Sequence, residues 1–144
     1  MILSNDNFFS TPKMAVGKGV FYPGAEVKLA RLQQLFPQDG IELCLGLRNP
    51  ATFLPAVFAL SPDMDLGGFL DGADPRELRW SELLARIRAA VPDIEVTVWC
   101  NEDTPLIWAH LIREMAGLVP NTKIIGGFDL LSEIMSKTGM QRFR

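Results

Sequence analysis

Two short, almost continuous apolar runs stand out in the pattern of hydrophobic and polar positions. The first, IELCLGL, covers 41–47, and the second, IEVTVW, covers 94–99. Turn-forming residues bound both runs, with Asp39-Gly40 and Asn49-Pro50 around the first and Val91-Pro92-Asp93 before the second. Runs of this length between turn signals are typical of buried strands. The pattern therefore predicts two strands.

Between and around these strands, apolar residues recur at helical spacing. The clearest stripe contains Trp80, Leu83, Leu84, Ile87 and Val91. Similar stripes on one side of a segment predict amphipathic helices. The predicted helices cover 24–36, 80–91, 105–117 and 128–136.

A further helix at 50–60 has two possible starts. Asn49 as the cap, with Pro50 at the first position, leaves Pro55 inside the helix, where it removes a hydrogen bond. Thr52 as the cap places Pro55 at the third position, where no bond is lost. We favour the second start, which makes 48–50 an extended loop.

The alternation of helices and strands predicts an α/β fold, with a mostly parallel sheet covered by helices on both faces. All of 1–144 fits one domain, in which the Gly- and Pro-rich stretches 1–23 and 61–79 are loops. Two strands make a poor sheet. We therefore expect the chain to be incomplete at its N-terminus, with Ile2-Leu3 ending a strand, and also at its C-terminus. The sheet edge left open would be covered by 1–20, by the C-terminal segment or by a second copy.

Composition narrows the classes of partner. With 48% hydrophobic residues, a net charge of −3 and a pI near 5.1, the chain is typical of soluble proteins and not of nucleic-acid-binding ones. No apolar run is long enough for a membrane span, and the first residues do not form a signal peptide. Cys44 and Cys100 fall at the strands, where small buried thiols are common, and they lack metal-ligand spacing. These features predict a cytoplasmic protein without a metal.

Arg48 is the strongest candidate for a functional residue. It stands at the carboxyl end of the first predicted strand, where ligands of open α/β sheets bind, and beside a helix N-terminus. A guanidinium at this place is suited to hold a phosphate. The alternative is an ordinary strand-end arginine that forms a salt bridge to a neighbouring loop.

This strand-Arg-Asn-Pro-helix element resembles the 3′-phosphate-binding element of sulfotransferases of the P-loop superfamily. LSNDNFF at 3–9, the predicted helix at 24–36 and the acidic turn Asn101-Glu102-Asp103 after the second strand are similar to flanking elements of that family, bacterial members in particular. The resemblance implies a partial sulfotransferase-like domain with three layers. It also implies 3′-phosphoadenosine 5′-phosphosulfate, or 3′,5′-adenosine bisphosphate, as a ligand of Arg48.

Two parts of the family pattern are missing. No Lys-Thr/Ser-Gly-Thr-Thr loop for the 5′-phosphosulfate precedes the first strand, and Gly17-Lys18-Gly19 lacks the hydroxyl residues. The literal match Lys137-Thr138-Gly139 follows a predicted helix, which we expect this glycine to end. Ala56 stands where the family usually has a serine that donates to the 3′-phosphate. The chain is therefore expected to be inactive by itself, and its catalytic residues stay unknown.

Other chemically active side chains have simpler explanations. Glu102 and Asp103 could serve as a general base, but carboxylates are also favourable near helix N-termini. His110 is predicted to be a partly packed helix residue, since no G-x-S-x-G motif supplies a nucleophile. Trp80, Trp99 and Trp108 occupy core-like positions. Several aspartates in the 61–79 loop lack calcium-loop spacing and are expected to keep it soluble: Asp63, Asp65, Asp71 and Asp74.

Two functions follow from these observations. The first is a sulfotransferase-like domain, related to enzymes that transfer a sulfuryl group from the nucleotide donor to a hydroxyl or amine. The second is a non-catalytic α/β module that associates with itself or binds a protein partner through an open sheet edge. Whether the chain is an enzyme is left open by the sequence.

Overall fold

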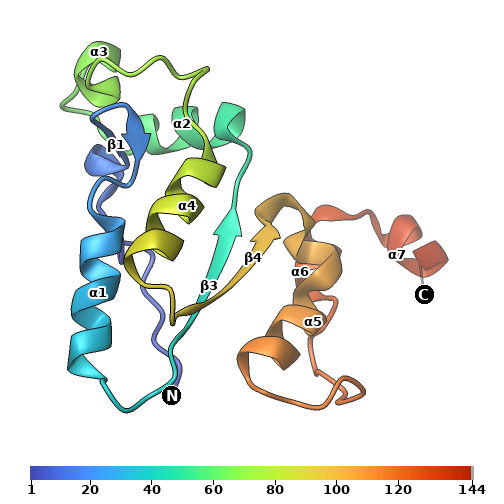
Figure 1. The fold of residues 1–144 in the computed structure, drawn as a ribbon. Helices are drawn as coiled ribbons and strands as arrows, with labels where there is room; N and C mark the ends of the chain where they lie inside the picture. The colour runs from blue at the N-terminus through green and yellow to red at the C-terminus, as the bar shows by residue number, and fades with distance from the viewer. Residues whose placement is uncertain (144) are drawn as a thin grey trace.

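The computed structural model describes residues 1–143, which form an α/β structure with seven α helices and two small sheets (Figure 1). The elements follow one another in this order: 3-10 helix η1 Pro12–Met14, β1 Val16–Gly17, β2 Val20–Phe21, α1 Ala25–Leu35, β3 Glu42–Leu47, α2 Pro50–Ala59, α3 Leu66–Leu70, α4 Trp80–Ala90, β4 Glu95–Cys100, 3-10 helix η2 Asn101–Asp103, α5 Thr104–Met115, α6 Asp129–Ile134 and α7 Lys137–Phe143.

The two predicted strands are confirmed as one parallel pair. β3 and β4 align from Glu42 opposite Glu95 to Leu47 opposite Cys100, so both strands end at the same edge. No other strand among residues 1–143 pairs with either of them. The predicted strand end at Ile2-Leu3 is wrong, because these residues lie outside any strand and are exposed.

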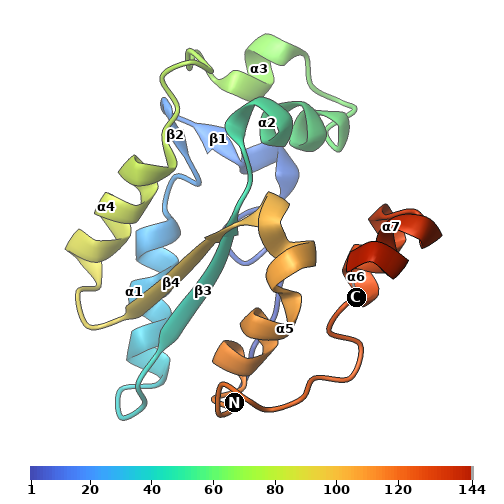
Figure 2. The ribbon, with the colours of Figure 1, turned by 90° about the vertical axis from the view of Figure 1, so that its right-hand side faces the viewer.

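Helices α1 and α4 cover one face of this pair, as their apolar stripes predict. Leu29 of α1 and Leu83 and Ile87 of α4 are almost fully buried, and Leu45 and Val96 of the strands pack against the same cluster. In Figures 1 and 2 the C-terminal helices lie on the other side of β4 from α4.

The start of α2 differs from the prediction. Asn49 caps the helix, with its Oδ1 accepting a hydrogen bond from the Ala51 N–H at 2.9 Å, and Pro50 takes the first position. Pro55 therefore lies inside the helix. The Asn49 cap and the preset φ of Pro50 outweigh the single hydrogen bond that Pro55 removes.

Both stretches predicted as loops contain regular structure. β1 and β2 form a hairpin whose turn is Lys18-Gly19, with positive φ at both residues. The segment 61–79 contains α3, whose Phe69 packs with Phe21 of the hairpin in a second buried cluster. This cluster fixes the hairpin and α3 against α2 and Trp80.

The C-terminal helices are only partly buried. Leu111 of α5 and Leu131 of α6 are buried, whereas Ile134 of α6 is 69% exposed and Ile125, in the connection between the two helices, is 96% exposed. No helix in residues 1–143 is long and apolar enough to cross a membrane.

Candidate functional site

The ends of β3 and β4 bring Arg48 and Glu102 to one place. Arg48 directly follows β3, and Glu102 lies in η2 directly after β4. Because the strands are parallel and in register, the segments that follow them meet at the same edge. The contact is direct, since the Asn49 N–H donates to Glu102 Oε1 at 2.9 Å. Arg48 and Glu102 therefore lie at the same edge of the β3–β4 pair.

Arg48 is held from both its side chain and its main chain. Its Nε donates to Thr52 Oγ1 at 3.0 Å, one turn into α2, and its carbonyl oxygen accepts from Trp80 Nε1 at 2.6 Å. The side chain is exposed and forms no ion pair with residues 1–143. The salt bridge considered as the alternative for Arg48 is therefore not formed, and Thr52 is a partner that the sequence did not indicate.

Glu102 is linked to this arginine through Thr52, whose Oγ1 lies 3.5 Å from Glu102 Oε1. Its carboxylate accepts from the Asn49 N–H and from the Cys100 thiol, whose Sγ lies 3.2 Å from Oε2. The hydrogen bond from Asn49 is the main reason that the pKa of Glu102 is lowered, and the bond to Glu102 raises the pKa of the Cys100 thiol. A carboxylate with a lowered pKa is a weak general base. Glu102 therefore fits the alternative, a carboxylate bound near a helix N-terminus.

Of the other candidates, only Cys100 is bonded to Glu102. Asp103 is the N-cap residue of α5 but makes no side-chain capping bond. His110 is exposed, and its Nδ1 lies 4.0 Å from Glu114 Oε1 one turn along the helix, so the prediction of a partly packed histidine is wrong. Cys100 is exposed and Cys44 half-buried, so neither is the fully buried thiol that the strands predict.

The prediction that Gly139 ends a helix is wrong, because Lys137-Thr138-Gly139 begins one. These residues form the first turn of α7, where the Gly139 N–H donates to Ser136 Oγ at 3.1 Å. The Ser136 hydroxyl acts as a local cap and outweighs the low helix propensity of glycine. Gly17-Lys18-Gly19 is part of the β1–β2 hairpin and does not form a phosphate loop.

The aspartates of the 61–79 loop do more than keep it soluble. Asp65 caps α3 by accepting from the Gly68 N–H at 2.6 Å, and Asp71 accepts from the Lys18 N–H of the hairpin turn at 2.9 Å. Asp63 pairs with Lys13 at 2.7 Å. Within residues 1–143, no group of three or more acidic, His or Cys side chains is placed to hold a metal ion.

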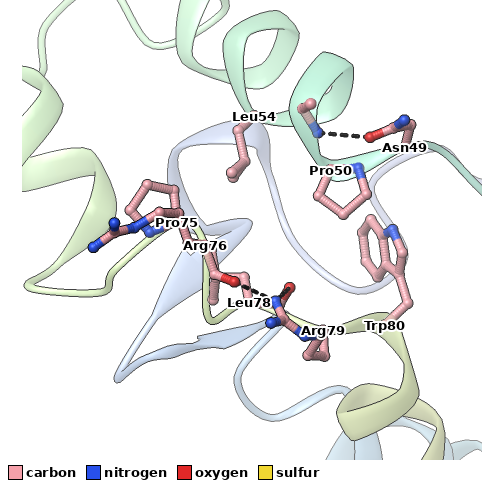
Figure 3. A pocket seen from close by; sticks show the side chains of 9 residues that line it. Asn49, Pro50, Leu54, Pro75, Arg76, Leu78, Arg79 and Trp80 are labelled. Atoms are coloured by element: carbon pink, nitrogen blue, oxygen red, sulfur yellow. Dashed lines mark hydrogen bonds between the residues drawn. The ribbon is translucent and has the colours of Figure 1, made fainter.

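A groove that the sequence did not reveal lies beside α2, between its first turn and the segment that leads into α4 (Figure 3). We call it the α2 groove. Its volume is about 520 Å³. It is lined by Asn49, Pro50, Ala51, Leu54, Pro75, Arg76, Leu78, Arg79 and Trp80. Arg48 and Thr52 are not among these residues, but two lining residues contact their site: Asn49 donates to Glu102, and Trp80 donates to the Arg48 carbonyl oxygen.

Comparisons of the chain with protein-family models, with curated proteins and with solved structures found no match.

Proposed function

We propose that this chain is a sulfotransferase-like α/β module that binds the 3′-phosphate of a 3′-phosphoadenosine nucleotide through Arg48. In this proposal β3 and β4 belong to a mostly parallel sheet with helices on both faces, as in the three-layer domain of the family that the sequence resembles. The related reaction is the transfer of a sulfuryl group from 3′-phosphoadenosine 5′-phosphosulfate to a hydroxyl or amine.

The observation that carries the proposal is the position of the Arg48 guanidinium. It stands beyond the carboxyl end of a parallel strand, Thr52 fixes its Nε, and no carboxylate in residues 1–143 pairs with it. Its terminal nitrogens make no hydrogen bond within these residues. They can therefore donate to a phosphate, for which a guanidinium gives a charge-assisted pair of bonds.

Three features limit the strength of this site. Ala56, half-buried in α2, offers no hydroxyl to the phosphate, and Glu102 places a negative charge near the same donors. Neither match to the 5′-phosphosulfate loop forms such a loop. We therefore expect weak binding without turnover, with a dissociation constant in the millimolar range, for which about 4 kcal/mol is sufficient.

Titration calorimetry with 3′,5′-adenosine bisphosphate tests the proposal. The wild-type chain should bind it, and Arg48→Ala should weaken binding at least about tenfold, because a charge-assisted bond to phosphate is lost. Arg31→Ala, at an exposed arginine on α1, is the matched control and should bind like the wild type. Adenosine 5′-monophosphate, which has no 3′-phosphate, should bind more weakly than the bisphosphate.

Glu102→Gln extends the same experiment. Glutamine keeps an oxygen that can accept from the Asn49 N–H but removes the charge that repels phosphate. This variant should bind the bisphosphate a few-fold more tightly than the wild type. Binding that survives Arg48→Ala, or an absence of binding by the wild type, contradicts the proposed site.

Self-association is a second candidate function, and one observation favours it. Both outer edges of the β3–β4 pair are free of strand partners among residues 1–143. Unpaired edges are templates for another strand, and parallel sheets are normally covered at their edges and on both faces. A second copy of the chain is the partner that this geometry favours.

A further inference from the structure

We propose that the α2 groove binds a small planar molecule that carries one negatively charged group, such as an aromatic carboxylate. Arg48 does not line the groove, and the proposal does not depend on nucleotide binding. Three properties of the groove support the proposal. Its lining is mostly apolar, one of its positive charges has no partner carboxylate, and its aromatic wall, Trp80, is fixed by residues outside the groove.

The lining is mostly apolar and fits a flat ring system. Pro50 and Leu54 come from α2, while Leu78 and Trp80 come from the facing segment (Figure 3). A volume of about 520 Å³ lies within the usual range for small-molecule sites. Apolar walls with a few placed polar groups are the common composition of such sites.

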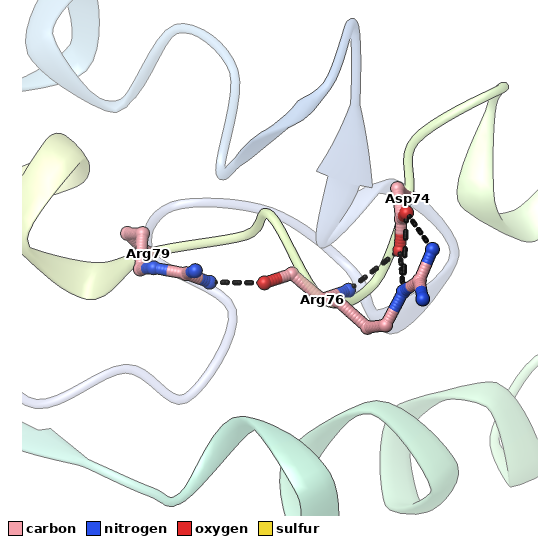
Figure 4. Close-up of polar contacts among 3 residues, drawn as sticks. All are labelled: Asp74, Arg76 and Arg79. Carbon is pink, nitrogen blue, oxygen red and sulfur yellow. Dashed lines mark hydrogen bonds and ion pairs between the residues drawn. The ribbon is translucent and has the colours of Figure 1, made fainter.

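The charge of the groove selects an anion. Two arginines and no carboxylate line it. Arg76 is neutralised by Asp74, which accepts from its Nε at 3.0 Å and from its Nη2 at 2.7 Å (Figure 4). Arg79 has no such partner within residues 1–143, because its Nη1 donates only to the main-chain oxygens of Arg76 and Leu78. One positive charge therefore remains for a ligand.

The main-chain donors at the start of α2 do not provide this charge. The Ala51 N–H is already bonded to Asn49 Oδ1, and Pro50 has no N–H. An anion in the groove would consequently be held by the Arg79 guanidinium. The two bonds of this guanidinium to main-chain oxygens fix its position.

The aromatic wall is fixed before any ligand arrives. Trp80 stacks on Phe21 with ring centroids 3.9 Å apart and an interplanar angle of 16°, and its Nε1 is bonded to the Arg48 oxygen. Phe21 itself is fully buried. A wall held in this way loses little conformational entropy on binding, which favours affinity.

The experiment compares two probes of the same shape, 2-naphthoate and the uncharged 2-naphthamide, by titration calorimetry. The wild-type chain should bind naphthoate saturably, and at least about fivefold more tightly than naphthamide, because only naphthoate pairs with Arg79. Arg79→Gln should reduce the affinity for naphthoate to that for naphthamide. Arg31→Gln, which changes an exposed arginine on α1 that does not line the groove, should leave naphthoate binding unchanged.

A second variant keeps the test valid if Arg79→Gln disturbs the loop. Ala51 is exposed, lines the groove and lies in the first turn of α2, where a glutamate is favourable to the helix. Ala51→Glu should therefore fold and yet weaken naphthoate at least about fivefold by repulsion. No saturable naphthoate binding, equal binding of both probes, or unchanged naphthoate binding by Ala51→Glu would each overturn the proposal.

Discussion

At the scale of single residues, Glu102 is the side chain that joins the ends of the two parallel strands. Its carboxylate, which follows β4, binds the Asn49 N–H that follows β3 and also accepts from the Cys100 thiol. These hydrogen bonds are made by the charged form, so they lower its pKa. The contact is therefore strongest when Glu102 is ionised.

The lowered pKa of Glu102 predicts a pH dependence of stability. The unfolded chain binds a proton at Glu102 at higher pH than the folded chain does. The stabilisation is therefore complete above the pKa of the unfolded chain's glutamate and is lost as the pH falls through the lowered pKa of the folded chain. Melting temperatures of the wild type and Glu102→Gln should differ at neutral pH and converge in acid. A difference that is constant or grows as the pH falls contradicts this assignment.

The sequence predicts part of this site for a physical reason. Parallel strands of equal length bring their following residues together, so the end of each apolar run is enough to place Arg48 and Glu102 at the same edge. The roles of Asn49 and Thr52 are harder to predict, because both residues are good N-caps. Which of them caps α2 depends on a free-energy difference of about 1 kcal/mol. The α2 groove depends on a distant contact, the stacking of Trp80 on Phe21, which leaves no local signal.

At the scale of elements, the strongest periodic patterns are reproduced and the weak ones are not. α1, α4, β3 and β4 lie within a residue or so of their predicted bounds because each has a clear apolar face. The β1–β2 hairpin has strands of only two residues, and α3 contains two glycines. Burial of Phe21 and Phe69 in one cluster stabilises both elements, and propensity alone does not predict this.

Pro55 gives a prediction at this scale. It lies inside α2 and is exposed, so it removes one helical hydrogen bond without filling the core. Pro55→Ala should raise the free energy of unfolding by about 1–2 kcal/mol. The gain from the restored hydrogen bond and the higher helix propensity of alanine exceeds the loss from the greater conformational entropy of the unfolded chain. Pro50→Ala, at the first position of the same helix, is the control and should bring no gain. Chemical denaturation measures both, and equal effects would contradict the argument.

At the scale of the whole molecule, the two unpaired edges of the β3–β4 pair are the main feature that the chain leaves unsatisfied. Within residues 1–143, neither 1–20 nor the C-terminal segment provides a strand for them, although the sequence suggested both as covers. Apolar side chains on β4 and on the C-terminal helices are exposed as well, including Val98 at 41% and Ile134 at 69%. A second copy of the chain can bury such surface and complete the hydrogen bonding of the strands.

Light scattering across a concentration series tests this association. The wild type should form dimers at high concentration, and Val98→Lys should weaken the dimer at least about tenfold, because a lysine on an edge strand opposes pairing. Val27→Lys provides the matched control. This valine is 50% exposed but lies on α1 and not on an edge strand, so its replacement should leave the dimer unchanged. A wild type that stays monomeric throughout, or equal effects of both lysines, removes the sheet edge as an interface.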